Sequence, residues 1–89
     1  MLTPDVNVLV DAFRTDSPHH RDVAPSLRSI VDSLESFALF ESVLAGFLRV
    51  VTHPGIFDPP APLGRAIDFA DALLAQPNCV VLRPGPRHW

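Results

Sequence analysis

This chain has almost no cysteine and lacks lysine entirely. Its 89 residues include one cysteine, Cys79, and no lysine. A lone cysteine cannot form an internal disulfide bond, which favours a reducing, cytoplasmic compartment. No apolar run approaches the ~20 residues of a membrane-spanning helix, and the first residues lack the basic segment and long apolar segment of a secretory signal. We therefore expect a soluble protein that does not enter a membrane.

Positive charge is also scarce. The chain has 10 acidic residues against 7 basic ones, every one an arginine, and a formal net charge of −3. Proteins that bind nucleic acid mainly by neutralising phosphates show a basic face, so any contact with RNA or DNA must here be local or mediated by a metal ion. Arginine also suits bidentate pairing with carboxylates, so a protein partner with an acidic surface remains open.

The apolar content indicates a folded chain. Hydrophobic residues make up 47% of the sequence and charged residues 19%, which excludes a disordered polar chain. At this length we expect one small domain, residues 1–89, with a marginal core.

Short apolar runs and amphipathic stretches alternate along the sequence. Residues 37–40 and 79–82 predict buried strands, and residues 18–34, 41–52 and 63–74 predict helices with one apolar face. For the first residues we favour a short strand at 2–5 followed by a helical turn, although Asp5 could equally cap a helix through Phe13. The alternation is typical of an α/β fold with a parallel sheet.

Two acidic residues lie at the edges of apolar segments. Asp5 precedes the run from Val6 to Val10, and Glu41 directly follows residues 37–40. In α/β proteins the edge where strands end holds ligands and metals, so the pair suggests a carboxylate site. Each acid also has a structural interpretation, since Asp5 could cap a helix and Glu41 could be a first-turn acid favoured by the helix dipole. Asn7 could bind a metal-bound water or close an Asx turn.

The other polar residues give weaker signals. Neighbouring helix residues point ~100° apart, so His19 and His20 do not readily share one metal ion. We expect Asp11 and Asp16 to be solvated. Cys79 lies in a predicted strand with no activating group nearby, which is typical of a small buried hydrophobe.

Four segments are informative together: residues 4–12 (PDVNVLVDA), 16–20 (DSPHH), 46–54 (GFLRVVTHP) and 83–89 (RPGPRHW). In this order and approximate spacing they resemble the PIN-domain family, in particular VapC-type toxins. The resemblance spans the whole chain. It implies a PIN-like three-layer α/β fold, in which a short parallel sheet is flanked by helices.

The resemblance also implies a function. VapC proteins are magnesium-dependent ribonucleases that act as toxins of type II toxin–antitoxin modules and are silenced by VapB-type antitoxins. Asp5 and Glu41 match two of the family's four acidic metal ligands, with Mg²⁺ as the expected ion and Mn²⁺ as a possible substitute. A VapB-type segment would lie in an apolar groove, for which the helices around residues 18–35 and 41–53 are candidate walls.

The family's two further aspartates lie in a C-terminal segment that this sequence does not include. We therefore expect a partial PIN domain without its last strands and helix, with weak metal binding and poor or absent catalysis. The alternative function is a catalytically silent remnant that at most binds an antitoxin. Exposed apolar surface would then favour a homodimer. A third interpretation is an unrelated α/β interaction module, in which Asp5 and Glu41 would lie far apart.

Overall fold

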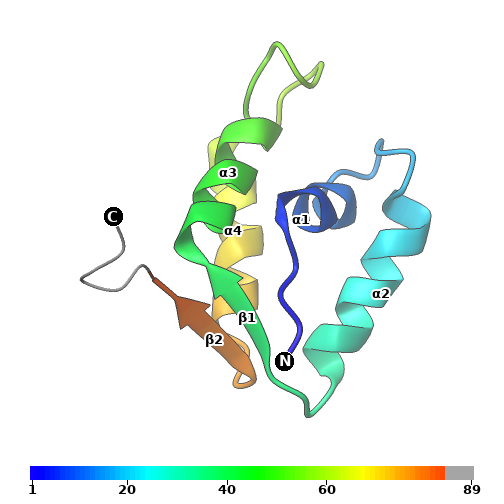
Figure 1. Cartoon of the computed structure of the whole chain (residues 1–89). Helices are drawn as coiled ribbons and strands as arrows, with labels where there is room; N and C mark the ends of the chain where they lie inside the picture. Colours follow the sequence, from blue (N-terminus) through cyan, green and yellow to red (C-terminus); the bar gives the residue numbers. More distant parts are fainter. Residues whose placement is uncertain (84–89) are drawn as a thin grey trace.

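Two short parallel strands and four helices make up the fold of the computed structural model, which describes residues 1–83 (Figure 1). The elements follow one another as α1 (Val6–Phe13), α2 (His20–Asp32), β1 (Phe37–Phe40), α3 (Glu41–Val51), α4 (Leu63–Leu74) and β2 (Cys79–Leu82). The strands pair in parallel, with Phe37 opposite Cys79 and Phe40 opposite Leu82. The prediction of an α/β fold with a parallel sheet is confirmed. Within residues 1–83, no helix has the length and apolar character needed to cross a membrane.

The N-terminal segment runs along the other edge of β1 (Figure 1). Leu2 forms a single parallel bridge with Phe37, and its carbonyl accepts a hydrogen bond of 2.7 Å from the Ala38 N–H. The predicted strand at residues 2–5 is therefore reduced to one bridge. Residues 6–13 form the helix α1 because Asp5 caps it and because Leu9 is buried on its inner face. Burial of this face outweighs the strand preference of the valines.

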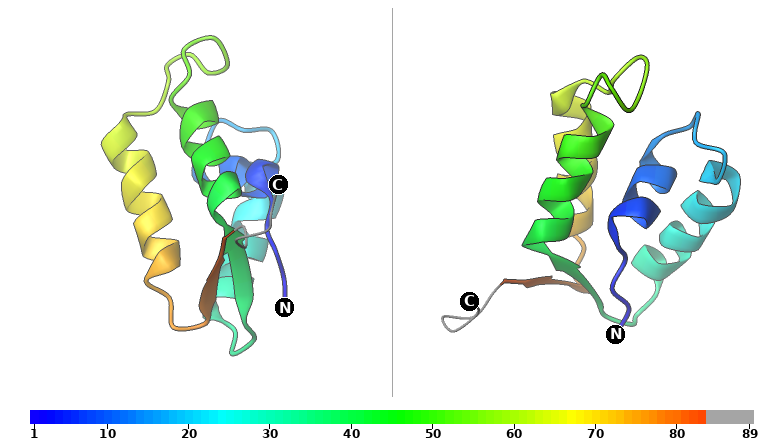
Figure 2. Two further views of the ribbon diagram at one scale, coloured as in Figure 1. Left: turned by 60° about the vertical axis from the view of Figure 1, so that its left-hand side comes forward. Right: turned by 45° about the horizontal axis from the view of Figure 1, so that its top comes forward.

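Helix α1 lies between α2 and α3, and α4 packs on the far side of α3 (Figure 2). Three aromatic rings join these helices, since Phe13 and Phe47 have centroids 5.4 Å apart and Phe69 lies 5.2 Å from Phe13. The largest fully buried side chains come from α1, β1 and α3 and include one of these rings: Leu9, Phe37, Leu39, Phe47 and Val51. The core therefore fixes where α1 begins relative to the sheet.

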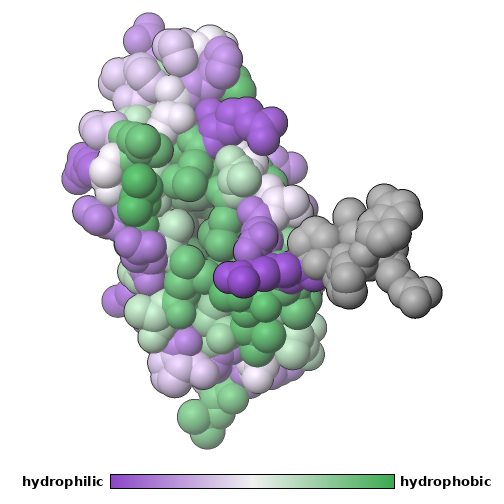
Figure 3. Space-filling view, turned by 90° about the vertical axis from the view of Figure 1, so that its left-hand side faces the viewer, coloured by the Kyte–Doolittle hydropathy of each residue, from purple (hydrophilic) through white to green (hydrophobic). Residues whose placement is uncertain are grey.

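Several apolar side chains that the sequence pattern assigns to the core are exposed. In α4 the helix buries Ala66, Ala70 and Leu73 but leaves Leu63, Ile67 and Leu74 exposed. The prediction of β2 as a buried strand is wrong, because β2 is an edge strand. Leu34, predicted on the apolar face of α2, is fully exposed beyond the end of that helix. Figure 3 shows hydrophobic residues gathered on the side of the molecule that carries α3, α4 and β2.

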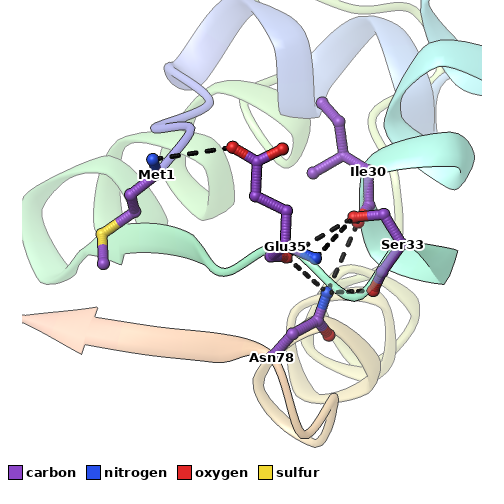
Figure 4. Close-up of polar contacts among 5 residues, drawn as sticks. All are labelled: Met1, Ile30, Ser33, Glu35 and Asn78. Atoms are coloured by element: carbon purple, nitrogen blue, oxygen red, sulfur yellow. Dashed lines mark hydrogen bonds and ion pairs between the residues drawn. The ribbon is translucent and has the colours of Figure 1, made fainter.

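Asn78 joins the end of α2 to the start of β2 (Figure 4). Its side-chain amide lies within hydrogen-bond distance of four backbone carbonyls, at 3.0 Å from those of Ser33 and Glu35 and at 3.3–3.4 Å from those of Val31 and Ile30. The last carbonyls of a helix have no partner within the helix. Asn78 supplies this partner and so fixes the turn that leads into β1.

Arg14 fixes the opposite end of the molecule. Its buried guanidinium donates to Asp16 through Nε (2.8 Å) and Nη2 (2.5 Å) and to the Pro59 carbonyl through Nη1 (3.0 Å). It also lies 4.3 Å from the ring centroid of Phe57. These contacts attach the proline-rich loop between α3 and α4 to the connection between α1 and α2.

Candidate functional site

Charged residues follow each of the three parallel segments. Asp5 comes after the N-terminal segment, Glu41 directly follows β1, and Arg83 directly follows β2. The carboxyl ends of parallel strands meet at one edge, where α/β proteins bind ligands. The bridge of Leu2 with Phe37 and the pairing of β1 with β2 therefore bring these three residues to the same edge.

Asp5 caps α1 and also faces solvent. Its Oδ1 accepts a hydrogen bond of 3.1 Å from the Val8 N–H, which satisfies one of the unpaired donors at the helix start. Its other oxygen makes no hydrogen bond with the part of the chain that the structure describes. The cap is thus confirmed, and it leaves one carboxylate oxygen available to a ligand.

A glycine lets α1 approach α3 closely. A Cβ atom placed on Gly46, in the middle of α3, would lie 3.1 Å from Cγ2 of Val6, the first residue of α1. This distance is tighter than most Cβ contacts, so a larger residue at 46 would push the two helices apart. The contact holds the helix that begins after Asp5 against the helix that begins at Glu41.

Glu41 is the first residue of α3, and its side chain is 49% exposed. The carboxylate forms an ion pair with the guanidinium of Arg83, through Oε1 and Nε. The helix N-terminus also favours a negative charge at this position. Glu41 therefore lies in the first turn of α3, as its structural interpretation expects. It also lies at the sheet edge, where a ligand would be bound.

Asn7 lies in the first turn of α1 and is exposed. Its side chain makes no hydrogen bond with residues 1–83, so the described contacts contain no Asx turn at this residue. Its position near Asp5 is compatible with a hydrogen bond to a metal-bound water, which stays a prediction.

The remaining polar candidates take part in local contacts. Asp11 accepts a hydrogen bond of 2.5 Å from the Ser17 hydroxyl, and the His20 Nδ1–H donates to the Asp11 carbonyl at 2.9 Å. Hydrogen bonding to Arg14 lowers the pKa of the Asp16 carboxyl. Asp16 is exposed, as expected for a solvated residue, and also pairs with Arg14, whereas Asp11 is half-buried. Burial raises the pKa of the Cys79 thiol, as expected for an unactivated cysteine.

No family model matches the chain, but several curated proteins do. Ribonuclease VapC43 of Mycobacterium tuberculosis is 47% identical over 89 residues, which is 100% of this chain and 60% of the relative. Ribonucleases VapC25 and VapC31 of the same species are 41% and 40% identical over 88 residues, 99% of this chain and 62% of each relative.

The chain is similar to VapC ribonucleases along its whole length. It spans about 60% of the length of the curated VapC ribonucleases it matches. The α/β architecture and the parallel sheet agree with the PIN-like fold that this family implies. The segment of residues 84–89, which completes the fourth motif, lies outside the described residues.

The two carboxylates fit a divalent cation as part of its ligand shell. Mg²⁺ is usually held by one or two carboxylates, while water and substrate phosphates complete the octahedron. Asp5 has an oxygen available, and both acids are solvent-accessible. Within residues 1–83 there is no cluster of three or more acidic, histidine or cysteine side chains suited to a metal ion. The described part of the chain therefore offers two carboxylates, Asp5 and Glu41, as candidate ligands.

An apolar groove lies between α2 and α4, with a volume of about 550 Å³. Its apolar lining comes from three helices: Ala12 of α1, Ala24, Leu27 and Val31 of α2, and Phe69 and Leu73 of α4. The sequence analysis predicts walls from the helices around residues 18–35 and 41–53, which are α2 and α3. Helix α3 contributes no lining residue, because α1 separates it from α2.

Sequence reasoning did not assign a role to Arg83, although it noticed the segment that Arg83 begins. The signal was available, since Arg83 directly follows the apolar run 79–82 as Glu41 follows 37–40. Because β1 and β2 pair in parallel, Glu41 and Arg83 lie close together in space.

Proposed function

We propose that this chain carries part of the active site of a divalent-metal-dependent ribonuclease, the toxin of a toxin–antitoxin module. The proposal is supported by the positions of Asp5 and Glu41, each of which follows one of two neighbouring parallel segments, and by the similarity of the chain to VapC ribonucleases. Mg²⁺ is the proposed ion and Mn²⁺ its alternative, because carboxylate oxygens suit both.

Each residue has a distinct role in this proposal. Asp5 is the first ligand, offering the oxygen that does not cap α1, and Glu41 is the second. Asn7 hydrogen-bonds water at the edge. A bound divalent ion supplies an activated water and stabilises the charge that develops on the scissile phosphate. The chain's own contribution is to hold both carboxylates at one place on rigid elements, which lowers the entropy cost of assembling the site.

An RNA cleavage assay tests the proposal. The 89-residue chain is incubated with a labelled single-stranded RNA in Mg²⁺, in Mn²⁺ and in EDTA, beside Asp5→Asn and Asp71→Asn. Asparagine still caps a helix, so Asp5→Asn removes the ligand charge and keeps α1. We expect cleavage that needs the metal ion and Asp5, while the Asp71→Asn control on α4 stays active. Cleavage unaffected by EDTA or by Asp5→Asn contradicts the proposal.

A second candidate function is a catalytically silent domain that binds an antitoxin. The two-carboxylate count within residues 1–83 and the pairing of Glu41 with Arg83 favour it. This function would be supported over the first if the chain binds an antitoxin but does not cleave RNA in Mg²⁺, in Mn²⁺ or in EDTA.

We propose that the groove between α2 and α4 receives an amphipathic segment of a VapB-type antitoxin. Apolar side chains in the groove offer the surface that such a segment buries, and His20 and Arg21 at its rim can meet acidic side chains. Copurification with a VapB-type antitoxin tests this. Ala72→Glu places a charge in the groove and should abolish copurification, whereas Ala45→Glu on the exposed side of α3 should not.

A homodimer and a cytoplasmic location are further proposals. The exposed apolar residues of α4 and β2, Ile67, Leu74, Val80 and Val81, support self-association. Sedimentation velocity over a concentration series measures it directly. A cytoplasmic location follows from the proposed RNA substrate, and fractionation of cells that express the tagged chain tests it.

A further inference from the structure

The sheet edge that holds the two acids also holds a cation. We propose that Arg83 is the phosphate-binding residue of this edge and positions a phosphodiester of single-stranded RNA beside Asp5 and Glu41. The inference rests on the proposed ribonuclease function. It adds a residue that contacts the substrate backbone and does not bind the metal ion.

Strand register places Arg83 at the site. Phe40 lies opposite Leu82 in the parallel pairing of β1 and β2. Glu41 and Arg83 directly follow the ends of these two neighbouring strands, and they form an ion pair. Position along the sheet, and not chance contact between long flexible side chains, therefore accounts for their proximity.

The guanidinium has donors to spare. Arginine carries five N–H donors in a planar fork that matches phosphate oxygens. The ion pair with Glu41 involves Nε, and within residues 1–83 the two terminal nitrogens of Arg83 make no hydrogen bond. The side chain is 73% exposed. Arg83 can thus pair with Glu41 and donate to a phosphate at the same time.

Arg83 provides positive charge at an edge that is otherwise acidic. The chain has a net charge of −3, and two carboxylates at the edge repel an approaching RNA backbone. Arg14 is buried against Asp16, Arg28 pairs with Asp32 on α2, and Arg21, Arg49 and Arg65 lie within the helices α2, α3 and α4. Arg83 is the arginine within residues 1–83 that directly follows a strand. It supplies the local positive charge that the composition otherwise lacks.

RNA binding without catalysis isolates this role. Fluorescence anisotropy of a fluorescein-labelled oligouridine is measured in EDTA over a series of KCl concentrations, for the full chain and for Arg83→Gln. A residue that neutralises one phosphate of a single strand contributes about 0.7 to the slope of log affinity against log salt. We expect Arg83→Gln to weaken binding about five- to tenfold at low salt and to reduce the slope by about this amount.

Three further variants separate phosphate binding from a structural effect. Arg83→Lys keeps the charge and should keep the slope. Arg28→Gln removes an equally exposed arginine from a surface ion pair and should change neither affinity nor slope. Glu41→Gln removes the negative charge but keeps an acceptor for Nε, so it should leave binding unchanged or tighter. Circular dichroism confirms that each variant is folded.

The outcomes distinguish this inference from the function on which it rests. RNA binding by the unmodified chain that Arg83→Gln leaves unchanged in affinity and slope overturns the role of Arg83 alone. A loss in Glu41→Gln as large as that in Arg83→Gln shows a structural ion pair and also overturns it. If the unmodified chain does not bind RNA in EDTA even at low salt, this inference fails, whereas the ribonuclease proposal is decided by the metal-dependent cleavage assay.

Discussion

Val6, the first residue of α1, packs against Gly46 in the middle of α3, at a distance that leaves little room for a Cβ atom. The contact fixes the helix that begins after Asp5 relative to the helix that begins at Glu41. One small residue inside a helix thus sets the geometry of the candidate site. Its cost to the intrinsic stability of α3, about 1 kcal/mol relative to alanine, is offset by this close packing.

Enlarging residue 46 should therefore destabilise the protein. Gly46→Val forces two methyl groups against Val6, and overpacking of this kind costs about 1–3 kcal/mol. Urea unfolding measures the change. Gly64→Ala in α4 is the control, because a Cβ at Gly64 meets nothing within 4 Å, and it should be neutral or slightly stabilising.

The pairing of Val6 with Gly46 can be tested by a double-mutant cycle. In a Val6→Ala background the extra methyl groups at residue 46 have space, so Gly46→Val should cost less than it does alone. Equal costs in both backgrounds would show that the two side chains do not meet as described.

Loss of the Asn78 amide should weaken the junction between α2 and β2. Asn78→Ala leaves carbonyls at the end of α2, including those of Val31 and Ser33, without their donor. We expect a loss of about 1–3 kcal/mol in the free energy of unfolding, measured in urea. Gln76→Ala removes a single bond to the Ala72 carbonyl, within the last turn of α4, and should change stability by less than about 1 kcal/mol. A similar effect of both changes argues against the role of Asn78.

Acid should weaken the link between Arg14 and Asp16. The Arg14 hydrogen bond lowers the pKa of Asp16 from 3.8, so this carboxyl stabilises the fold above that value. Its contribution is lost as pH falls through the lowered pKa of the folded state. Asp16→Asn should therefore lower the Tm at pH 7, and the difference should shrink in acid below pH ~3. A difference in Tm that persists unchanged into acid would contradict an ionic origin.

Much of the fold was predictable from periodicity. The bounds of α4 and β2 agree with the predicted 63–74 and 79–82, and β1 with 37–40, because hydrophobic patterns and prolines mark these elements well. The first residues were harder, since the valines of residues 6–10 favour a strand locally. The cap at Asp5 and the burial of Leu9 decide for a helix.

The candidate site was predictable only in part. Position at the edge of an apolar run made Asp5 and Glu41 candidates, since Asp5 precedes residues 6–10 and Glu41 follows residues 37–40. The partnership of Arg83 with Glu41 depends on strand order and register, which one sequence does not reveal. The exposure of Ile67 and Leu74 likewise follows from which faces of α4 find a neighbour, and not from the pattern along the helix.

Calorimetric titration with Mn²⁺ tests the central claim most directly. The 89-residue chain is compared with Asp5→Asn, Glu41→Gln and the control Asp71→Asn, each shown to be folded by circular dichroism. We expect one weak site in the unmodified chain and the control, and a large loss of affinity in both edge variants. Binding that survives both edge changes, or no binding by the folded unmodified chain, would contradict a metal site at this edge of the sheet.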